Sequence, residues 1–111
     1  MSAQHGQLLE PQQLLDKVQN EDVYFIDVRT PAEFKKGHIE GAENVDFMAR
    51  DFAEQLKQFP PNKPIVVYCH SGRRSGLTTK TLLKLGFKNE TIFDLKGGTI
   101  NWEKQGFKLV K

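Results

Sequence analysis

The sequence has only one cysteine and no long apolar run, and each scarcity excludes a class of protein. A single cysteine, Cys69, cannot form an intramolecular disulfide, a Cys-x-x-Cys redox pair or a zinc site that needs several cysteines. The apolar run from Ile65 to Cys69 is far shorter than the roughly 20 residues that a membrane helix needs. The chain also starts without a basic segment followed by an apolar one, so we expect no secretory signal, no membrane partner and a cytoplasmic location.

The charge of the whole chain is close to neutral, but its distribution is uneven. The 111 residues carry 16 Lys and Arg against 14 Asp and Glu, a net charge of +2 that argues against a nucleic-acid partner. Residues 1–62 hold 6 basic and 11 acidic residues, whereas residues 63–111 hold 10 basic and 3 acidic ones. The basic half is either an ordinary solvated surface or a place prepared for an anion. At this length, and with no internal repeat or linker, we expect one domain over residues 1–111.

Short apolar segments alternate with amphipathic ones, which predicts an α/β fold with a mostly parallel sheet and helices on both faces. Strands are expected at residues 7–9, 23–28, 65–68 and 91–95, with another short strand near residue 45. Helices are expected at residues 11–20, 50–59 and 75–85, and after residues 97–98. In such folds the functional crevice lies at the carboxyl ends of the strands. The segments expected there are Asp27 to Arg29, the Cys69 segment and Leu95 to Gly98.

One segment combines a buried strand, the cysteine and the start of a helix. Ile65 to Tyr68 is the expected strand, Cys69 follows it, and a short loop containing Gly72 leads into the helix. Such a turn can aim the unpaired N–H groups of the first helical turn at one point, where the helix dipole adds positive charge. Arg73 and Arg74 add full charges nearby. These surroundings favour the reactive thiolate form of a cysteine, whereas a merely buried cysteine has no need of two arginines.

Two thiolate reactions fit this loop: hydrolysis of a phosphate ester through a phosphocysteine, and transfer of sulfur through a persulfide. The common loop of cysteine phosphatases follows the pattern Cys-x5-Arg, in which the arginine clamps the phosphate. Here Ser75 occupies the arginine position, and Arg74 gives a loop that is one residue shorter. Tyr68 stands where a phosphatase usually has a histidine. Because a shorter loop closes around a smaller group, the spacing favours sulfur transfer over phosphatase or arsenate reductase chemistry.

Three segments, in order, resemble those of the rhodanese-like sulfurtransferases. The loop Cys69-His70-Ser71-Gly72-Arg73-Arg74 is similar to the active-site loop of small single-domain members. Asp27 to Val45 resembles their signature D-x-R-x-x-x-E-F-x-x-G-H-I-x-G-A-x-N, and Gly97 to Trp102 resembles their G-G-x-x-x-W signature. The resemblance implies a five-stranded sheet and a catalytic Cys69 that accepts a sulfane sulfur. It also implies that the backbone amides of the loop, from His70, Ser71, Gly72, Arg73 and Arg74, hold the persulfide or the incoming anion.

Four polar residues of the upstream signature are candidates for shaping the cleft. Asp27 and Arg29 either frame the cleft or form a buried ion pair, with Glu33 as the other possible partner of Arg29. The ion pair is the favoured interpretation. His38 could act as an acid or base at neutral pH. In the family context we instead expect it to bond to the backbone and to order the Gly37–Gly41 loop.

The other notable residues have structural interpretations. Gly97 and Gly98 are expected to allow tight packing beside the Cys69 loop rather than to bind phosphate. His70 either contacts the donor or points to solvent, and the sequence favours neither. Four aromatic residues are expected in the core: Phe47, Phe52, Phe59 and Trp102.

The sequence thus predicts an enzyme of the thiosulfate sulfurtransferase (rhodanese) type that needs no metal or cofactor and works by a ping-pong mechanism. Its expected donor is a small anion such as thiosulfate, a polysulfide or a persulfide, and its acceptor is a thiol or cyanide. Arg73 or Arg74 would attract the donor and stabilise the departing charge. A persulfide carrier, or a binding module for one protein partner, is the alternative. The loop matches neither the C-R-x-G pattern of large rhodaneses nor the C-G-S/T-G pattern of mercaptopyruvate enzymes, which leaves the donor open.

Overall fold

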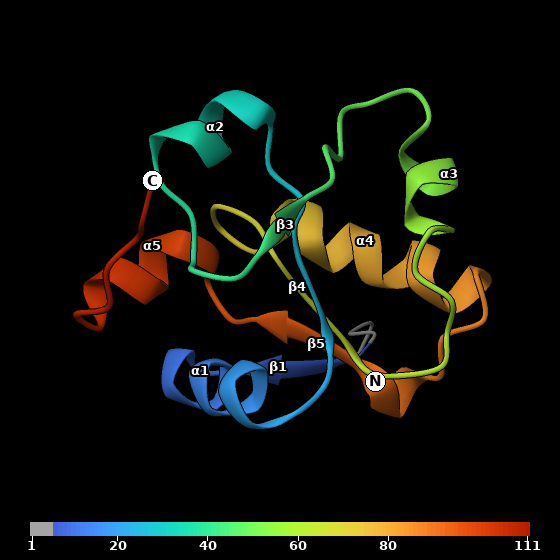
Figure 1. The fold of residues 1–111 in the computed structure, drawn as a ribbon, viewed down its shortest axis with the longest axis horizontal. Helices are drawn as coiled ribbons and strands as arrows, with labels where there is room; N and C mark the ends of the chain where they lie inside the picture. The colour runs from blue at the N-terminus through green and yellow to red at the C-terminus, as the bar shows by residue number, and fades with distance from the viewer. Residues whose placement is uncertain (1–5) are drawn as a thin grey trace.

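Five parallel strands form the centre of the structure, a computed structural model that describes residues 6–111 (Figure 1). The strands are β1 (Gln7–Leu9), β2 (Tyr24–Asp27), β3 (Glu43–Asn44), β4 (Ile65–Tyr68) and β5 (Ile92–Leu95). The helices are α1 (Pro11–Asn20), α2 (Pro31–Lys36), α3 (Phe52–Leu56), α4 (Arg73–Lys84) and α5 (Gly98–Lys104), with a 3-10 turn, η1, at Asn89–Thr91. The order across the sheet is β1-β5-β4-β2-β3, and each of these pairings is parallel. The expected α/β class with a five-stranded parallel sheet is confirmed.

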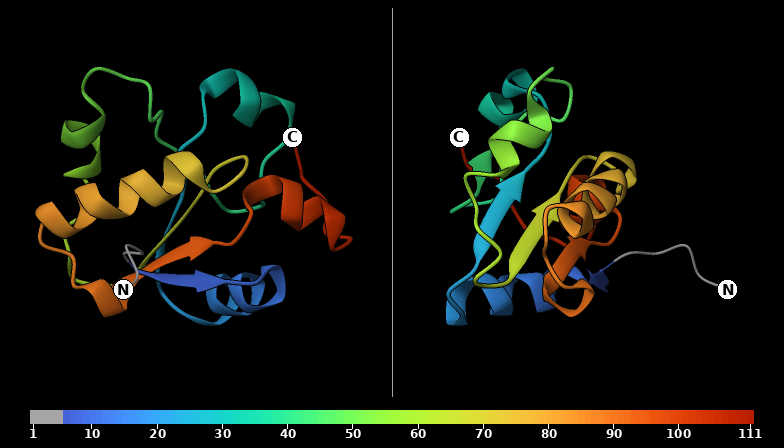
Figure 2. Two further views of the ribbon diagram at one scale, coloured as in Figure 1. Left: turned by 180° about the vertical axis from the view of Figure 1, so that it is seen from behind. Right: turned by 90° about the vertical axis from the view of Figure 1, so that its right-hand side faces the viewer.

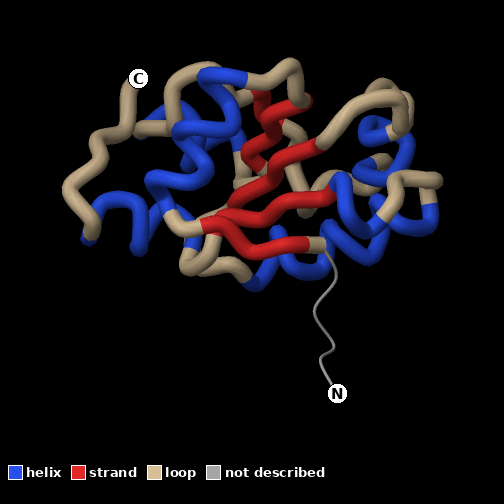
Figure 3. Tube along the Cα trace, turned by 90° about the horizontal axis from the view of Figure 1, so that it is seen from below, coloured by secondary structure: helices blue, strands red, loops and turns tan. Residues whose placement is uncertain are grey.

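Helices cover both faces of the sheet, because its central strands are apolar on both sides (Figure 3). All four residues of β4 are buried, and successive side chains point to opposite faces. Val67 packs in one core with Phe52 of α3 and Leu82 of α4. Val66 packs in the other core with Leu14 of α1 and Trp102 of α5. The sheet is therefore the middle layer of three, and its carboxyl edge is left for a site.

The chain changes its direction of travel across the sheet between β2 and β4. From β2 it proceeds to β3 on one side, whereas from β4 it proceeds to β5 on the other. Because the two connections depart in opposite directions, a crevice opens at the carboxyl ends of these strands. In the register of the two strands Asp27 lies opposite Tyr68, the residue before Cys69. The strand order thus brings the Asp27 and Cys69 segments together.

Three helices differ from the sequence-based expectation, and one of them, α4, begins two residues before the expected Ser75, so that Arg73 and Arg74 lie in its first turn. The helix expected at residues 50–59 is limited to α3, because the Phe59 N–H bonds to the Leu56 carbonyl three residues back and Pro60 restricts the backbone before it. The sequence analysis does not predict α2, which buries none of its six residues and so has no apolar period. A capping box between Thr30 and Glu33, with Pro31 at the first helical position, stabilises α2 instead.

The expected core aromatics lie where the two apolar layers need them. Phe52, Phe59 and Trp102 are buried, and Phe47 is partly buried against the same core as Phe52. Within residues 6–111, no helix is long and apolar enough to cross a membrane. The same part of the chain contains no group of three or more His, Cys, Asp or Glu side chains that could hold a metal ion.

Candidate active site around Cys69

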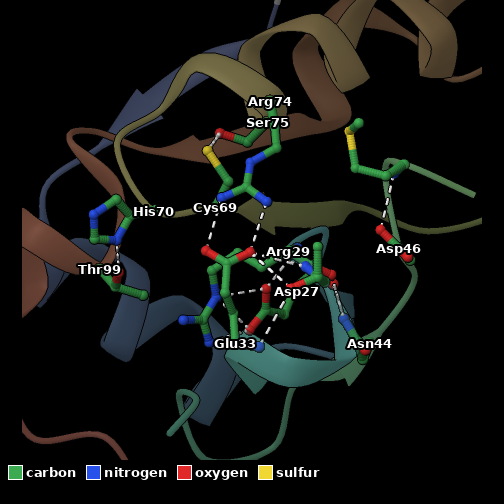
Figure 4. Close-up of polar contacts among 12 residues, drawn as sticks. Asp27, Arg29, Glu33, Asn44, Asp46, Cys69, His70, Arg74, Ser75 and Thr99 are labelled. Atoms are coloured by element: carbon green, nitrogen blue, oxygen red, sulfur yellow. Dashed lines mark hydrogen bonds and ion pairs between the residues drawn. The ribbon is translucent and has the colours of Figure 1, made fainter. Parts of the chain in front are cut away.

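Cys69 lies at the carboxyl end of β4 beside the first turn of α4, and only 1% of its surface is exposed (Figure 4). Its Sγ atom accepts a hydrogen bond from the backbone N–H of Gly72 (3.1 Å) and lies 3.4 Å from the Ser75 hydroxyl oxygen. Gly72 has a φ of 106°, in the left-handed region that glycine adopts without strain, and it turns the loop back toward the sulfur. An N–H donor and a hydroxyl group close to Sγ stabilise negative charge there, and the thiolate is the nucleophilic form of cysteine.

The first turn of α4 adds to this electrostatic environment. The first intrahelical bond runs from the Gly76 N–H to the Gly72 carbonyl, so the amides of the preceding turn have no acceptor within the helix. Their partial positive charge adds to that of the helix dipole at the N-terminal end of α4, the end that follows Cys69 in the chain. Of the loop residues, His70, Ser71 and Arg73 are exposed, whereas Gly72 and Arg74 are partly buried. The loop therefore presents both backbone donors and one exposed cation.

The first residues of α5 donate hydrogen bonds to the Cys69 loop, which lies between α4 and α5 in Figures 1 and 2. The N–H groups of Thr99 and Ile100 donate to the carbonyls of Cys69 (2.9 Å) and His70 (3.1 Å). The His70 Nδ1 atom lies 3.2 Å from the Thr99 hydroxyl oxygen, so this ring leans on α5 (Figure 4). The expected tight packing of Gly98 beside the loop is confirmed, since it touches the loop backbone directly.

Replacing Gly98 with alanine is expected to displace the Cys69 loop. The new Cβ atom would lie 2.4 Å from the His70 carbonyl carbon and oxygen, and the φ of Gly98 is 60°. The clash and the left-handed strain together predict a loss of about 2–5 kcal/mol in the free energy of unfolding. Urea denaturation measures it. Gly106→Ala is the matched control, because Gly106 has the same kind of backbone (φ 93°) but no neighbour within 4 Å of a new Cβ. Equal losses in the two variants would contradict the packing argument.

Asp27 and Arg29 form a buried ion pair at the end of β2 (Figure 4). The guanidinium Nη2 lies 2.7 Å from Asp27 Oδ2, and Nε lies 3.0 Å from both carboxylate oxygens. Nη2 also donates to the Gly37 carbonyl (2.6 Å), and the cation stands 5.7 Å from the centre of the Tyr68 ring. Burial opposes the charge of Arg29, but the bond to Asp27 and its charge outweigh burial and raise the pKa of Arg29. Arg29 thus pairs with Asp27 and not with Glu33.

Glu33 pairs instead with Arg74, across 41 residues of sequence. Arg74 Nη1 and Nη2 lie 2.8 and 2.9 Å from the two Glu33 oxygens, a fork-to-fork geometry (Figure 4). This bond, more than the Thr30 donors, lowers the pKa of Glu33 to about 2, and the same bond raises the pKa of Arg74. The pair ties α2 to α4. Arg73 is exposed and has no ion-pair partner within residues 6–111.

The Glu33–Arg74 pair predicts a pH-dependent contribution to stability. The pKa of Glu33 is depressed from 4.5, so the contribution is complete above that value and disappears as the pH falls through about 2. The side chains are 32% and 24% exposed, which limits the contribution to about 0.5–1 kcal/mol. We expect Glu33→Gln to lower the free energy of unfolding by this amount near neutral pH. At about pH 2 and below, where Glu33 is protonated, the substitution should have no effect. Glu54→Gln, which breaks the exposed pair with Lys57, is the control and should have no measurable effect. A Glu33→Gln loss that stays constant with pH would contradict the ion-pair origin.

His38, which lies in the Gly37–Gly41 loop, bonds to the backbone as expected. Its Nδ1 atom lies 3.1 Å from the Phe34 carbonyl of α2, and its ring stacks on the Phe34 ring with centroids 3.9 Å apart. Its own N–H and carbonyl bond to Val110 near the end of the chain. His38 thus joins its loop to α2 and to the C-terminal segment.

Two polar residues near the site are not singled out by the sequence analysis. The Asn44 amide donates to the carbonyls of Asp27 (3.0 Å) and Arg29 (2.8 Å), which fixes the backbone beyond β2 (Figure 4). Asp94, on β5, is 2% exposed, and burial raises its pKa to about 6 even though the Ser75 hydroxyl partly offsets the rise. The sequence does contain a sign of this buried carboxyl group, because Asp94 is the one acidic residue in the otherwise apolar strand β5.

Comparisons with known proteins agree with this geometry. The family described as the rhodanese-like domain matches residues 10–105. The protein named thiosulfate sulfurtransferase 16, chloroplastic, of Arabidopsis thaliana is 41% identical over 92 residues, which cover 74% of this chain and 75% of that protein. A protein named sulfurtransferase of Allochromatium vinosum is 32% identical over 90 residues, covering 81% and 80%. The crystal structure of a rhodanese-related protein from Thermoplasma volcanium superposes with a TM-score of 0.79 at 26% identity, covering 94% of this chain and 97% of that one.

Proposed function

The chain belongs to the rhodanese-like domain family, and we propose that it is a sulfurtransferase whose nucleophile is Cys69. The observation that carries the proposal is the convergence of the Gly72 N–H and the Ser75 hydroxyl on Sγ at the start of α4. Cys69 is also the only cysteine of the 111 residues. The names of the two relatives above support the same type of reaction.

The first half-reaction loads Cys69 with sulfur. The thiolate attacks the outer sulfur of an anionic donor such as thiosulfate, an S–S bond forms at Sγ, and the S–S bond of the donor breaks. Sulfite leaves with the bonding electron pair. A thiolate nucleophile needs no general base for this step. The Gly72 N–H and the first turn of α4 supply hydrogen-bond donors for the charge on the sulfur.

The second half-reaction unloads the persulfide. A thiolate or cyanide attacks the outer sulfur, the bond between that sulfur and Sγ breaks, and the Cys69 thiolate is regenerated. With no second cysteine among the 111 residues, no resolving thiol is available within them. The acceptor is therefore a separate molecule or a separate protein segment.

Arg73 is the arginine that we assign to the attraction of the donor. It is exposed beside the loop and has no ion-pair partner within residues 6–111, whereas Arg74 is bound to Glu33. An exposed cation at the start of α4, four residues after Cys69, raises the local concentration of a small anion such as thiosulfate. This refines the expectation that either arginine serves.

A single-turnover loading experiment tests the proposal. Reduced protein is incubated separately with thiosulfate, polysulfide, glutathione persulfide and mercaptopyruvate, and intact mass spectrometry detects the addition of one sulfur atom. We expect at least one donor to load Cys69, and cyanide to remove the sulfur as thiocyanate with repeated turnover. Failure of every donor to load Cys69 would contradict the proposal.

The same experiment separates the remaining candidates. Loading without repeated turnover identifies a persulfide carrier for a protein partner rather than an enzyme. Hydrolysis of an aryl phosphate, measured in parallel, would instead identify a phosphatase. We expect none, because the loop from Cys69 to Arg74 is one residue shorter than the phosphatase pattern and Arg74 is held by Glu33.

A further inference from the structure

Asp94 is a buried acidic residue on β5, beside the strand that leads to Cys69. In the parallel register of β4 and β5 it lies opposite Val67, two residues before Cys69. Its side chain faces α4, since a Cβ atom placed on Gly76 would lie 4.0 Å from Asp94 Oδ2. The residue is 2% exposed, and Oδ1 has no hydrogen-bond partner among residues 6–111. A buried carboxyl oxygen without a donor is rare and requires an explanation.

One buried hydroxyl group on α4, that of Ser75, makes no short hydrogen bond and can supply that donor. Three hydroxyl residues of α4 are buried, and two of them, Thr78 and Thr79, donate short bonds of 2.8 and 2.6 Å to carbonyls of their own helix. Ser75 makes only long contacts, 3.3 Å to a backbone carbonyl and 3.4 Å to Cys69 Sγ. Strong O–H···O bonds are about 2.7–2.8 Å long, so the Ser75 proton is weakly held and can turn toward either neighbour.

Ser75 acts on two titratable groups: its hydroxyl oxygen lies 3.4 Å from Cys69 Sγ, and its hydroxyl lowers the pKa of Asp94 against the larger effect of burial. The basic residues of α4 do not face Asp94 within residues 6–111: Arg73, Lys80 and Lys84 are exposed, and Arg74 is bound to Glu33. The charged residues of α5 are exposed, and β1 has no titratable side chain. The Tyr68 ring packs in the core on the other face of the sheet. Burial places the pKa of Asp94 at about 6, so its charge changes just below neutral pH.

We propose that Asp94 is a positioning residue that acts on Cys69 through Ser75, an inference that rests on the proposed role of Cys69 as nucleophile. Ser75 has one hydroxyl proton, so it can donate to the Asp94 carboxylate or to the sulfur anion but not to both. When Asp94 is protonated, its O–H donates to Ser75 Oγ, and the Ser75 proton is left for the sulfur. When Asp94 releases its proton to solvent, the carboxylate takes the Ser75 donor and the sulfur loses it.

The ionisation of Asp94 therefore opposes the formation of the Cys69 thiolate. The carboxylate withdraws the Ser75 hydrogen bond from the sulfur, which makes the sulfur anion less stable. Between about pH 5 and 7 this loss of a donor should flatten the rise of Cys69 reactivity with pH. An uncharged residue of the same shape at position 94 should remove the flattening, because its amide donates to Ser75 at every pH.

Alkylation of Cys69 by iodoacetamide, followed by mass spectrometry from about pH 5 to 9, tests the proposal without any sulfur transfer. We expect the wild-type rate to show a shoulder near pH 6, where Asp94 titrates. Asp94→Asn should lose the shoulder and react about three to ten times faster at neutral pH. Ser75→Ala should also lose the shoulder, and adding Asp94→Asn to it should change the rate little.

Two outcomes would overturn the inference. The first is a wild-type profile without a shoulder, which needs no variant and so is immune to folding defects. The second is an Asp94→Asn acceleration that is equally large with and without Ser75, which would mean that the carboxylate acts directly on the sulfur. Far-ultraviolet circular dichroism and cooperative urea unfolding confirm that each variant is folded. Because alkylation reports only on the thiolate, a failed sulfur-transfer assay with an intact shoulder would refute the proposed function and leave the coupling standing.

Discussion

Replacing Cys69 with serine is expected to abolish sulfur transfer while leaving the protein folded. The hydroxyl of serine is a far weaker nucleophile near neutral pH and cannot form a persulfide, so turnover should fall by at least about a thousandfold. The change removes one buried, weakly polar atom, and Ser75 and the Gly72 N–H remain to bond the new hydroxyl. Thiocyanate formation from thiosulfate and cyanide measures the activity.

The loss must be assigned to chemistry rather than to structure. Thermal unfolding of Cys69→Ser should be cooperative, with a midpoint close to that of the wild type. Lys84→Ala, at the exposed far end of α4, is the matched control and should keep full activity. Activity that survives Cys69→Ser would exclude the persulfide mechanism. If Cys69→Ser loses both activity and cooperative unfolding, Cys69→Ala replaces it in the test, because alanine removes the nucleophile without adding a polar group.

Replacing Arg29 with methionine is expected to cause a large loss of stability. Methionine fills much of the same volume, but it leaves the Asp27 carboxylate buried and uncompensated and deprives the Gly37 carbonyl of its donor. Removing one partner of a buried ion pair lowers the free energy of unfolding by about 3–5 kcal/mol. Urea denaturation of the two proteins measures the difference. The combined Asp27→Asn and Arg29→Met change should recover part of the loss, because the unpaired charge is gone.

A matched exposed pair and a conservative variant sharpen this prediction. Lys57→Met breaks the exposed Lys57–Glu54 pair and should change stability by less than about 0.5 kcal/mol. Arg29→Lys keeps the charge but loses the forked geometry, so it should destabilise without changing KM for the donor. A raised KM with unchanged stability would show that Arg29 contacts the donor and is not a structural anchor. An Arg29→Met variant as stable as the wild type would contradict the buried-pair argument.

Much of the fold was predictable because it depends on short-range patterns. The apolar run Ile65 to Tyr68 and the alternation of apolar segments with amphipathic ones predict strands and covering helices, since each must bury its apolar face. The helix α2 escapes this reasoning, because it buries none of its residues and depends on the Thr30–Glu33 capping box. The end of α3 escapes it as well, because Phe59 continues the apolar period after the helical bonds have stopped.

The amino-acid sequence by itself determined the class of fold, the family resemblance and the position of Cys69 between a strand and a helix. These follow from residues that are neighbours in the chain, so local spacing is enough to indicate them. Only the tertiary structure decided which charges meet: Arg74 with Glu33, and Arg29 with Asp27. It also decided that Asp94 lies buried and faces α4 at Gly76, the residue after Ser75. Long polar side chains have several partners within reach, and the distances that choose among them exist only once the sheet has brought remote segments together.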